Sequence, residues 1–148
     1  MYEFEKLEIW GMSLDIVEQV RNLARTHILR KDRWLADQMQ RAAMSLSLNI
    51  AEGKGSGSDK EFRRFLKIVL RSLYELIGCI RISTRLGLLK DEDCTKVLQL
   101  CDSFGARTNK LISVLSETIK GSRKASRKQR VANSQCGEVA EWLKAADC

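Results

Sequence analysis

The sequence predicts an all-α protein: an antiparallel, up-down-up-down four-helix bundle followed by a disordered basic C-terminal tail. Its 148 residues include no proline, and Leu, Lys, Arg and Glu are abundant, which favours helices over a β fold. Apolar residues also recur at steps of three and four in four separate segments, as they do along one face of an α-helix. Four such helices joined by short connections are typical of a bundle.

Each of the four segments supplies one apolar helix face. The charged connection 27–33 separates the first two segments, and we expect the bundle domain to cover residues 1–120. The apolar series are Leu7, Trp10, Leu14, Val17, Val20 and Ala24; Leu35, Met39, Ala42, Leu46 and Ile50; Phe62, Phe65, Val69, Leu73, Leu76 and Ile80; and Val97, Cys101, Phe104, Thr108, Leu111 and Leu115.

Helix boundaries are indicated by local sequence signals. The glycine-serine stretch 53–58 predicts the end of the second helix and a turn. Ser58 with Glu61 predicts a capping box at the start of the third helix. Gly87 is typical of a helix C-cap, and Asp91 is a candidate N-cap for the fourth helix.

Charge is concentrated near the C-terminus. The formal net charge is +7, and the stretch 120–130 contains six basic residues and no acidic one. The region 121–148 lacks a sustained apolar period, so we expect a disordered tail. Such a tail is attracted to phosphate backbones. The alternative is a solvated basic extension without a ligand.

The end of the chain has a coding pattern of its own. Val139–Trp142 can be encoded as GTG-GCC-GAG-TGG, which resembles the D-arm of a bacterial tRNA gene. The last two codons and a stop can read GAC-TGT-TAA, which contains a string like the anticodon loop of an asparagine tRNA. We therefore expect residues from about Cys136 onward to be disordered and dispensable for assembly. The alternative is a short amphipathic helix that docks Trp142 and Leu143 on a partner.

Several functional classes are disfavoured by composition. The first ten residues do not resemble a secretory signal, and no uncharged apolar run approaches the roughly 20 residues that span a bilayer. The five cysteines show no CxxC spacing, and His27 is the single histidine, so we expect no metal site. A cytoplasmic protein with free thiols is the expectation.

No catalytic site or cofactor is expected either. The stretch GKGSGSDK resembles a phosphate loop only superficially, because its lysine precedes the second glycine and a helix precedes it instead of a strand. His27 has no identifiable orienting partner for nucleophilic catalysis. Acid–base chemistry by Glu52 and Glu75 is conceivable, but one carboxylate pair is weak support for an enzyme.

Polar residues interrupt the apolar pattern of the second and third helices. Ser45, Asn49 and Glu52 are spaced four and three apart and share one helical face. Ser72 and Glu75 form a similar pair on the third helix. We interpret all five as an interhelical hydrogen-bond network, because buried polar groups need partners. A ligand-facing polar patch is the alternative.

A row of basic residues follows the opposite face of the third helix. Its members are Lys60, Arg64, Lys67 and Arg71, flanked by Arg63. Most charged helix faces are simply solvated. The alternative, and our candidate nucleic-acid-binding site, is a surface for nucleic acid or for an acidic partner.

Three motifs resemble a known family. QMQRAAMSLSLNIAEG (38–53), SLYEL (72–76) and FEKLEIW (4–10) are similar to conserved stretches of the bacterial four-helix-bundle proteins encoded within intervening sequences of 23S ribosomal RNA genes. The resemblance covers residues 4 to about 118. Members often have proline and serine where this chain has Ser47 and Leu48, and many place an arginine where it has Ser56.

The resemblance implies a four-helix bundle that assembles as a ring-like homopentamer and has no established activity. Related bundles are accessory proteins of diversity-generating retroelements, in which a basic pentamer engages a reverse transcriptase and nucleic acid. We therefore expect a non-enzymatic, oligomeric module that binds nucleic acid, with structured RNA as the ligand. The alternative is a protein-interaction adaptor for a reverse transcriptase.

Overall fold

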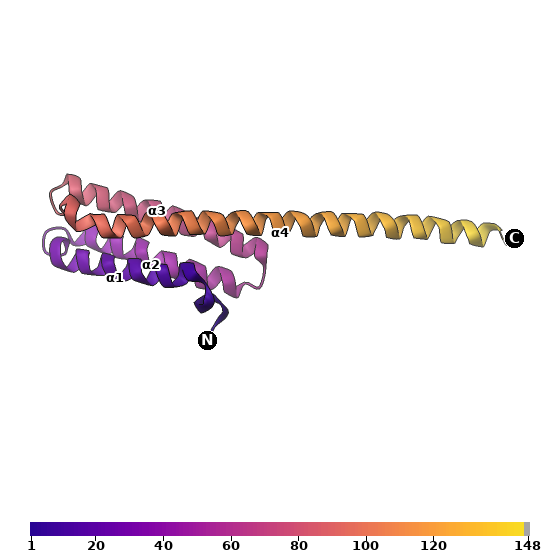
Figure 1. Cartoon of the computed structure of the whole chain (residues 1–148), viewed down its shortest axis with the longest axis horizontal. Helices are drawn as coiled ribbons and strands as arrows, with labels where there is room; N and C mark the ends of the chain where they lie inside the picture. The colour runs from indigo at the N-terminus through magenta and orange to yellow at the C-terminus, as the bar shows by residue number, and fades with distance from the viewer. Residues whose placement is uncertain (147–148) are drawn as a thin grey trace.

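A computed structural model describes the backbone of residues 1–146 and the side chains of residues 1–127 and 129. Over these residues the chain is helical without strands, as the sequence predicts, and successive long helices run in opposite directions (Figure 1). The elements are the 3₁₀ helix η1 (Glu3–Lys6), α1 (Glu8–Leu23), the π-helical turn η2 (Ala24–Ile28), α2 (Arg33–Gly55), α3 (Asp59–Arg85) and α4 (Asp91–Ala146).

The connection between α1 and α2 is shorter than predicted, because helix continues through η2. Ala24 and Ile28 are both fully buried, so this extra turn contributes to the core. The Leu29 amide donates to the Ala24 carbonyl at 2.8 Å, the wider spacing of a π-turn. Asp32 then caps α2, where its carboxylate accepts from the Leu35 amide at 2.9 Å.

The end of α2 differs from the prediction. The helix does not stop at Gly53 but continues to Gly55, and the turn comprises residues 56–58, with Gly57 at a φ of +69°. Gly53 lies inside the helix and is buried. A Cβ on Gly53 would lie 2.5 Å from the Cβ of Phe65, so this glycine permits close contact between α2 and α3.

Half of the predicted capping box is present at the start of α3. Ser58 Oγ accepts from the Glu61 amide at 3.5 Å. The reciprocal bond is replaced, because the Ser58 amide donates to Ser56 Oγ at 3.4 Å and the Glu61 carboxylate pairs with Arg64. Ser56 therefore takes the role predicted for the glutamate.

The turn between α3 and α4 is a Schellman motif centred on Gly87. Its φ is +69°, its amide donates to the Thr84 carbonyl at 3.0 Å, and the Leu88 amide donates to the Ser83 carbonyl at 2.9 Å. Asp91 is the first residue of α4 rather than its cap. The carboxylate of Asp93 accepts from the Lys90 amide at 3.1 Å.

The core matches the predicted apolar faces of three helices and differs in α1. Every predicted member on α2 is buried, as are all but Phe65 on α3 and all but Leu111 on α4. On α1 the prediction was wrong at Leu14, which is exposed. A neighbouring face of α1 is buried instead. Its residues are Ile9, Ser13, Ile16 and Val20.

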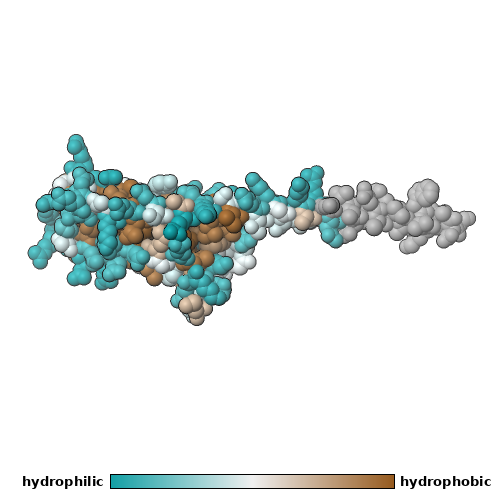
Figure 2. All heavy atoms as spheres, viewed as in Figure 1, coloured by the Kyte–Doolittle hydropathy of each residue, from teal (hydrophilic) through white to brown (hydrophobic). Residues whose placement is uncertain are grey.

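Beyond the bundle, α4 remains helical to Ala146, whereas the sequence predicts an irregular tail from residue 121. No proline occurs in this region, and Ala, Arg, Lys and Gln are good helix formers. Residues 121–127 are all exposed, and Figure 2 shows hydrophilic side chains there beside residues of near-neutral hydropathy. The predicted alternative, in which Trp142 and Leu143 dock on a partner, involves side chains outside those described.

None of the helices, as far as the chain is described, combines the length and apolarity needed to cross a membrane.

Candidate functional site

Three of the five predicted network residues meet at the seam between α2 and α3. Ser45 Oγ and Ser72 Oγ lie 2.9 Å apart. The side-chain amide of Asn49 donates to the Ser45 carbonyl at 2.8 Å and to Ser45 Oγ at 2.9 Å. Asn49 thus bonds the hydroxyl that joins the two helices, while its own two bonds stay within α2.

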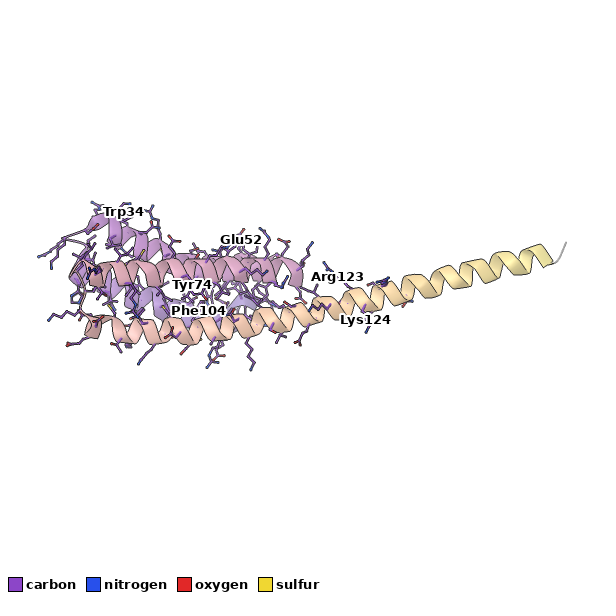
Figure 3. All side chains as sticks on the ribbon, turned by 90° about the horizontal axis from the view of Figure 1, so that it is seen from above. Trp34, Glu52, Tyr74, Phe104, Arg123 and Lys124 are labelled. Atoms are coloured by element: carbon purple, nitrogen blue, oxygen red, sulfur yellow. The ribbon has the colours of Figure 1, made fainter. Side chains whose placement is uncertain are left out.

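The two glutamates lie apart from this cluster. Glu75 accepts a hydrogen bond from the side-chain amide of Gln38, two turns before Ser45 on the same edge of α2. Glu52 is exposed, points outward from α2 (Figure 3), and has no ion pair or side-chain hydrogen bond to another described residue. Gln38 was missed, although its seven-residue spacing from Ser45 places it on the same face.

A second polar contact, between α1 and α2, was also missed. Ser13 Oγ and Ser47 Oγ lie 2.9 Å apart in the core, and both residues are buried. Ser13 Oγ also lies 2.6 Å from the Trp10 carbonyl, which it can bond as a donor. A small polar residue on an apolar helix face is the signal that could have revealed it. Ser47 thus has a defined partner across the contact between α1 and α2.

The predicted basic row of α3 divides into engaged and free cations. Arg63 Nε donates to Ser116 Oγ at 2.7 Å and so joins α3 to α4. Arg64 Nε lies 2.8 Å from the Glu61 carboxylate, and its guanidinium stacks over the Phe65 ring at 4.8 Å. These two arginines therefore have partners within the protein.

The remaining three cations form what we call the α3 cationic stripe: Lys60, Lys67 and Arg71. All three are exposed, and none is in an ion pair with another residue of the described part of the chain. Helix α3 carries seven basic and three acidic side chains, a net charge of +4. A row of unpaired, solvated cations can neutralise phosphates without losing internal contacts.

Large apolar side chains are also exposed on α2 and α3. We call this set the α2–α3 outer face. Trp34 and Tyr74, which are 70% and 65% exposed, are its largest members (Figure 3). Large aromatic and aliphatic side chains in such numbers on two adjacent helices are typical of a protein contact surface. Its members are Trp34, Met44 and Leu48 of α2 and Tyr74, Ile82 and Leu86 of α3.

His27 has a neighbour that the sequence did not reveal. Its Nδ1 lies 4.0 Å from the Asp93 carboxylate, across the junction of η2 and α4. A shallow hollow there is also lined by Lys31 and Lys90. Cys94, next in sequence to Asp93, is buried and lies 3.7 Å from Thr84 Oγ1, so it is not positioned as an exposed nucleophile.

The buried thiols favour a packing role over a chemical one. Cys79, Cys94 and Cys101 are free and buried. Burial, followed by the charge of Asp102, raises the pKa of Cys101 to about 12, which keeps the thiol neutral. Burial also raises the pKa of Cys79, to which the charge of Glu75 adds. Within the described residues no three His, Cys, Asp or Glu side chains form a cluster that could hold a metal ion.

Comparison with known proteins gives a family match. The family model of the 23S rRNA-intervening sequence proteins matches residues 5–110. No curated protein matches the chain. The matched range contains the α2–α3 seam, the α3 cationic stripe and the outer face, and it ends before the basic part of α4.

Proposed function

Because the chain belongs to the family of 23S rRNA-intervening sequence proteins, we propose that it is a non-enzymatic helical bundle that binds structured RNA as a homo-oligomer. The observation that carries the proposal is the α3 cationic stripe, whose three side chains are exposed and unpaired among the described residues. The link between this family and ribosomal RNA genes supports RNA as the polyanion.

Phosphate contact has a measurable signature. Each phosphate that a lysine or arginine neutralises releases condensed counterions, so the logarithm of affinity falls by about 0.7–0.9 per contact for each log unit of salt. A loss of affinity alone would not show whether the replaced cations contact phosphates or only contribute to the net charge of the protein. The salt slope counts contacts, and a variant at another site with the same charge change controls for net charge.

The test compares two triple variants for binding to a labelled RNA duplex by fluorescence anisotropy across salt concentrations. The triple variant Lys60→Gln, Lys67→Gln and Arg71→Gln should make the plot of log affinity against log salt less steep. The steepness should fall by roughly 2 to 3 units, the sum of three contacts. The matched control, Arg25→Gln, Arg30→Gln and Lys31→Gln, removes three exposed cations near the turn between α1 and α2 and should leave the slope unchanged. Equal losses in both variants would contradict a site on α3.

The α2–α3 outer face supports the oligomeric part of the proposal. An apolar surface that stays exposed favours association, because burying it removes water from apolar groups. A second copy of the chain is an occupant that is always present, and the family resemblance implies a pentamer. In a closed ring of five copies this face would pack against a different surface of the next copy, in one heterologous contact repeated five times.

Light scattering during size-exclusion chromatography tests this assembly. We expect a mass of five chains, and Leu48→Lys with Tyr74→Lys should lower it by placing charges in the contact. Lys96→Glu, on the exposed face of α4, is the control and should keep the wild-type mass. A monomeric wild-type protein would refute the assembly while leaving the RNA-binding test unaffected.

A further inference from the structure

We propose that the α4 extension, residues 120–127, carries a second phosphate-binding site that takes the backbone of double-helical RNA. The site is centred on Arg123 and Arg127. This inference rests on the proposed function, because it adds a contact to the same ligand. It concerns residues beyond 110, where the family match ends, so it is a property of this chain.

The contact between Arg63 and Ser116 sets the register of α3 against α4. Helix α3 begins at Asp59, four residues before Arg63. Because the helices are antiparallel, the start of α3 lies about one turn beyond Ser116 along α4, near Lys120. From there α4 continues without a neighbour from α3, as its exposed side chains show.

The face of α4 that binds α3 inside the bundle becomes cationic outside it. Lys120, Arg123 and Arg127 follow Ser116 by four, seven and eleven residues. At 100° per residue these intervals return to within about 40° of Ser116, so the four residues share one face. Where α3 ends, the contact surface is therefore replaced by a row of basic side chains.

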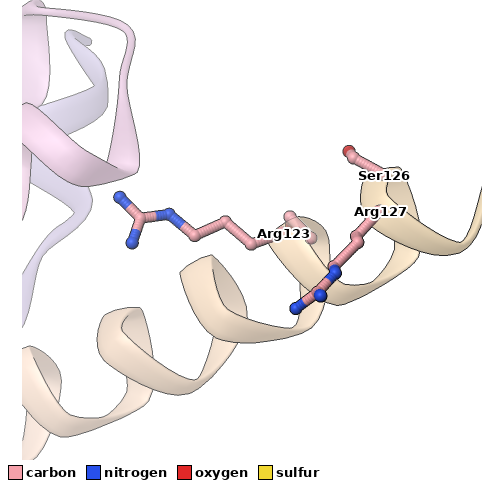
Figure 4. A pocket seen from close by; sticks show the side chains of 4 residues that line it. Arg123, Ser126 and Arg127 are labelled. Atoms are coloured by element: carbon pink, nitrogen blue, oxygen red, sulfur yellow. The ribbon is translucent and has the colours of Figure 1, made fainter. Parts of the chain in front are cut away.

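The two arginines line an open hollow at the end of the bundle. Its volume is about 380 Å³, and Ser122 and Ser126 complete the lining. Both guanidinium groups reach back toward the bundle, and that of Arg123 points at the turn between α2 and α3 (Figure 4). Neither arginine has an ion pair or a hydrogen bond to another described side chain. Two guanidinium forks suit phosphate oxygens, which accept bidentate bonds from arginine. Of the two hydroxyls beside them, that of Ser122 donates to the Thr118 carbonyl at 3.0 Å.

The chemistry of residues 120–127 favours a phosphate backbone over other anionic surfaces. The segment has four cations, no acid and no apolar residue larger than Ala125. A helix that inserts into a membrane surface needs a face of large apolar residues, and a site for single-stranded bases needs aromatic rings for stacking. Recognition by charge and hydroxyl groups alone suits the regular phosphates of a duplex, without sequence readout.

The experiment uses the full chain and the same labelled RNA duplex. Lys120→Gln, Arg123→Gln and Arg127→Gln keep good helix formers and should lower the salt slope by roughly 2 to 3 units. The Arg25, Arg30 and Lys31 variant serves again as the charge-matched control. A second duplex of unrelated sequence should give the same slope, because the site reads phosphates. Combining the α3 and α4 substitutions should remove both increments, since the sites contact one ligand.

Each outcome assigns the failure to one proposal. If wild-type protein binds no duplex at low salt, the proposed function fails and this inference with it. A slope that falls in the α3 variant but not in the α4 variant overturns this inference alone. A slope that falls only in the α4 variant supports this inference and overturns the site on α3. Binding to anionic vesicles that the α4 substitutions abolish, with an unchanged RNA slope, would show a membrane site instead.

Discussion

At Gly53 the backbone of α2 approaches α3 so closely that a hydrogen atom is the largest substituent that fits. The virtual Cβ lies 2.5 Å from the Cβ of Phe65 and 3.0 Å from its Cγ. The Phe65 Cβ is fixed to its own backbone, so the contact cannot be relieved by rotating a side chain. The glycine that ends the QMQRAAMSLSLNIAEG motif is therefore explained by packing and not by a turn.

Gly53→Ala should destabilise the protein, because the two helices must separate to accept the methyl group. We expect a loss of about 1–3 kcal/mol in the free energy of unfolding, the range for overpacked cores. Urea unfolding measures it. Gly11→Ala, in α1 with no atom near its virtual Cβ, is the control and should stabilise by about 0.5–1 kcal/mol through helix propensity. Similar effects of both substitutions would refute the packing argument.

Cys101 should make stability depend on pH in the alkaline range. Its pKa rises from 9.0 to about 12 on folding, chiefly through burial. Above pH 9 the unfolded chain loses this proton while the native protein keeps it, so the free energy of unfolding falls as pH rises toward 12. Cys101→Ala lacks this term. Its stability deficit relative to wild type should therefore narrow by about 1 kcal/mol between pH 8 and pH 10. A constant deficit would contradict a buried neutral thiol.

Among the elements, the helices themselves were predictable and their contacts were only partly so. The 3.6-residue period depends on neighbours in sequence, so α2, α3 and the packed part of α4 were identified with their core faces. The continuation of α2 past Gly53 was missed because the local preference of glycine for turns was outweighed by a contact with Phe65, which is distant in sequence.

The α2–α3 seam and the basic row show the same limit. Shared helix faces predicted that Ser45, Asn49 and Ser72 would meet, but they could not place Glu52, whose position at the edge of α2 depends on the crossing of the two helices. Likewise, the spacing of cations on α3 could not reveal that Arg63 bonds to Ser116, because that contact depends on how α4 packs.

Asn49→Leu should change the assembly more than Lys90→Ala. Asn49 holds Ser45 toward Ser72 at the seam, and Leu would free that hydroxyl and add apolar surface beside the exposed Leu48. Lys90 is an exposed residue of the turn between α3 and α4 and does not belong to the seam residues. Light scattering after size-exclusion chromatography would show the difference. A wild-type mass for Asn49→Leu would refute a role of the seam in assembly.

At the scale of the whole molecule, the bundle and the α4 extension differ in what supports them. At 1.5 Å per residue, the 56 residues of α4 span about 84 Å, whereas the 27 residues of α3 span about 40 Å. Inside the bundle α4 is held by Cys94, Val97, Cys101 and Phe104 in the core. Residues 121–127 are all exposed, so among the described side chains only local helix propensity acts there. Isolated helical segments of this kind are marginal in water.

Hydrogen exchange should therefore divide α4 into two parts. Amides at 97–115 should exchange slowly, close to the rate of global unfolding, whereas those at 122–127 should exchange within the first seconds. Mass spectrometry of peptides from the native protein would locate the boundary, which we expect near residue 120. Uniform protection along the whole of α4 would show that the extension has a packing partner.

The direction of α4 has a consequence for avidity. In a ring of five copies, rotational symmetry gives every α4 extension the same inclination to the ring axis, so extensions that run along the axis would all emerge at one end. Five separate phosphate-binding arms would then face one duplex, and the first to bind would raise the local concentration of RNA for the others. A site too weak to hold RNA in a single chain could thus retain it in the ring. Retention would depend on duplex length, because a short duplex reaches fewer arms.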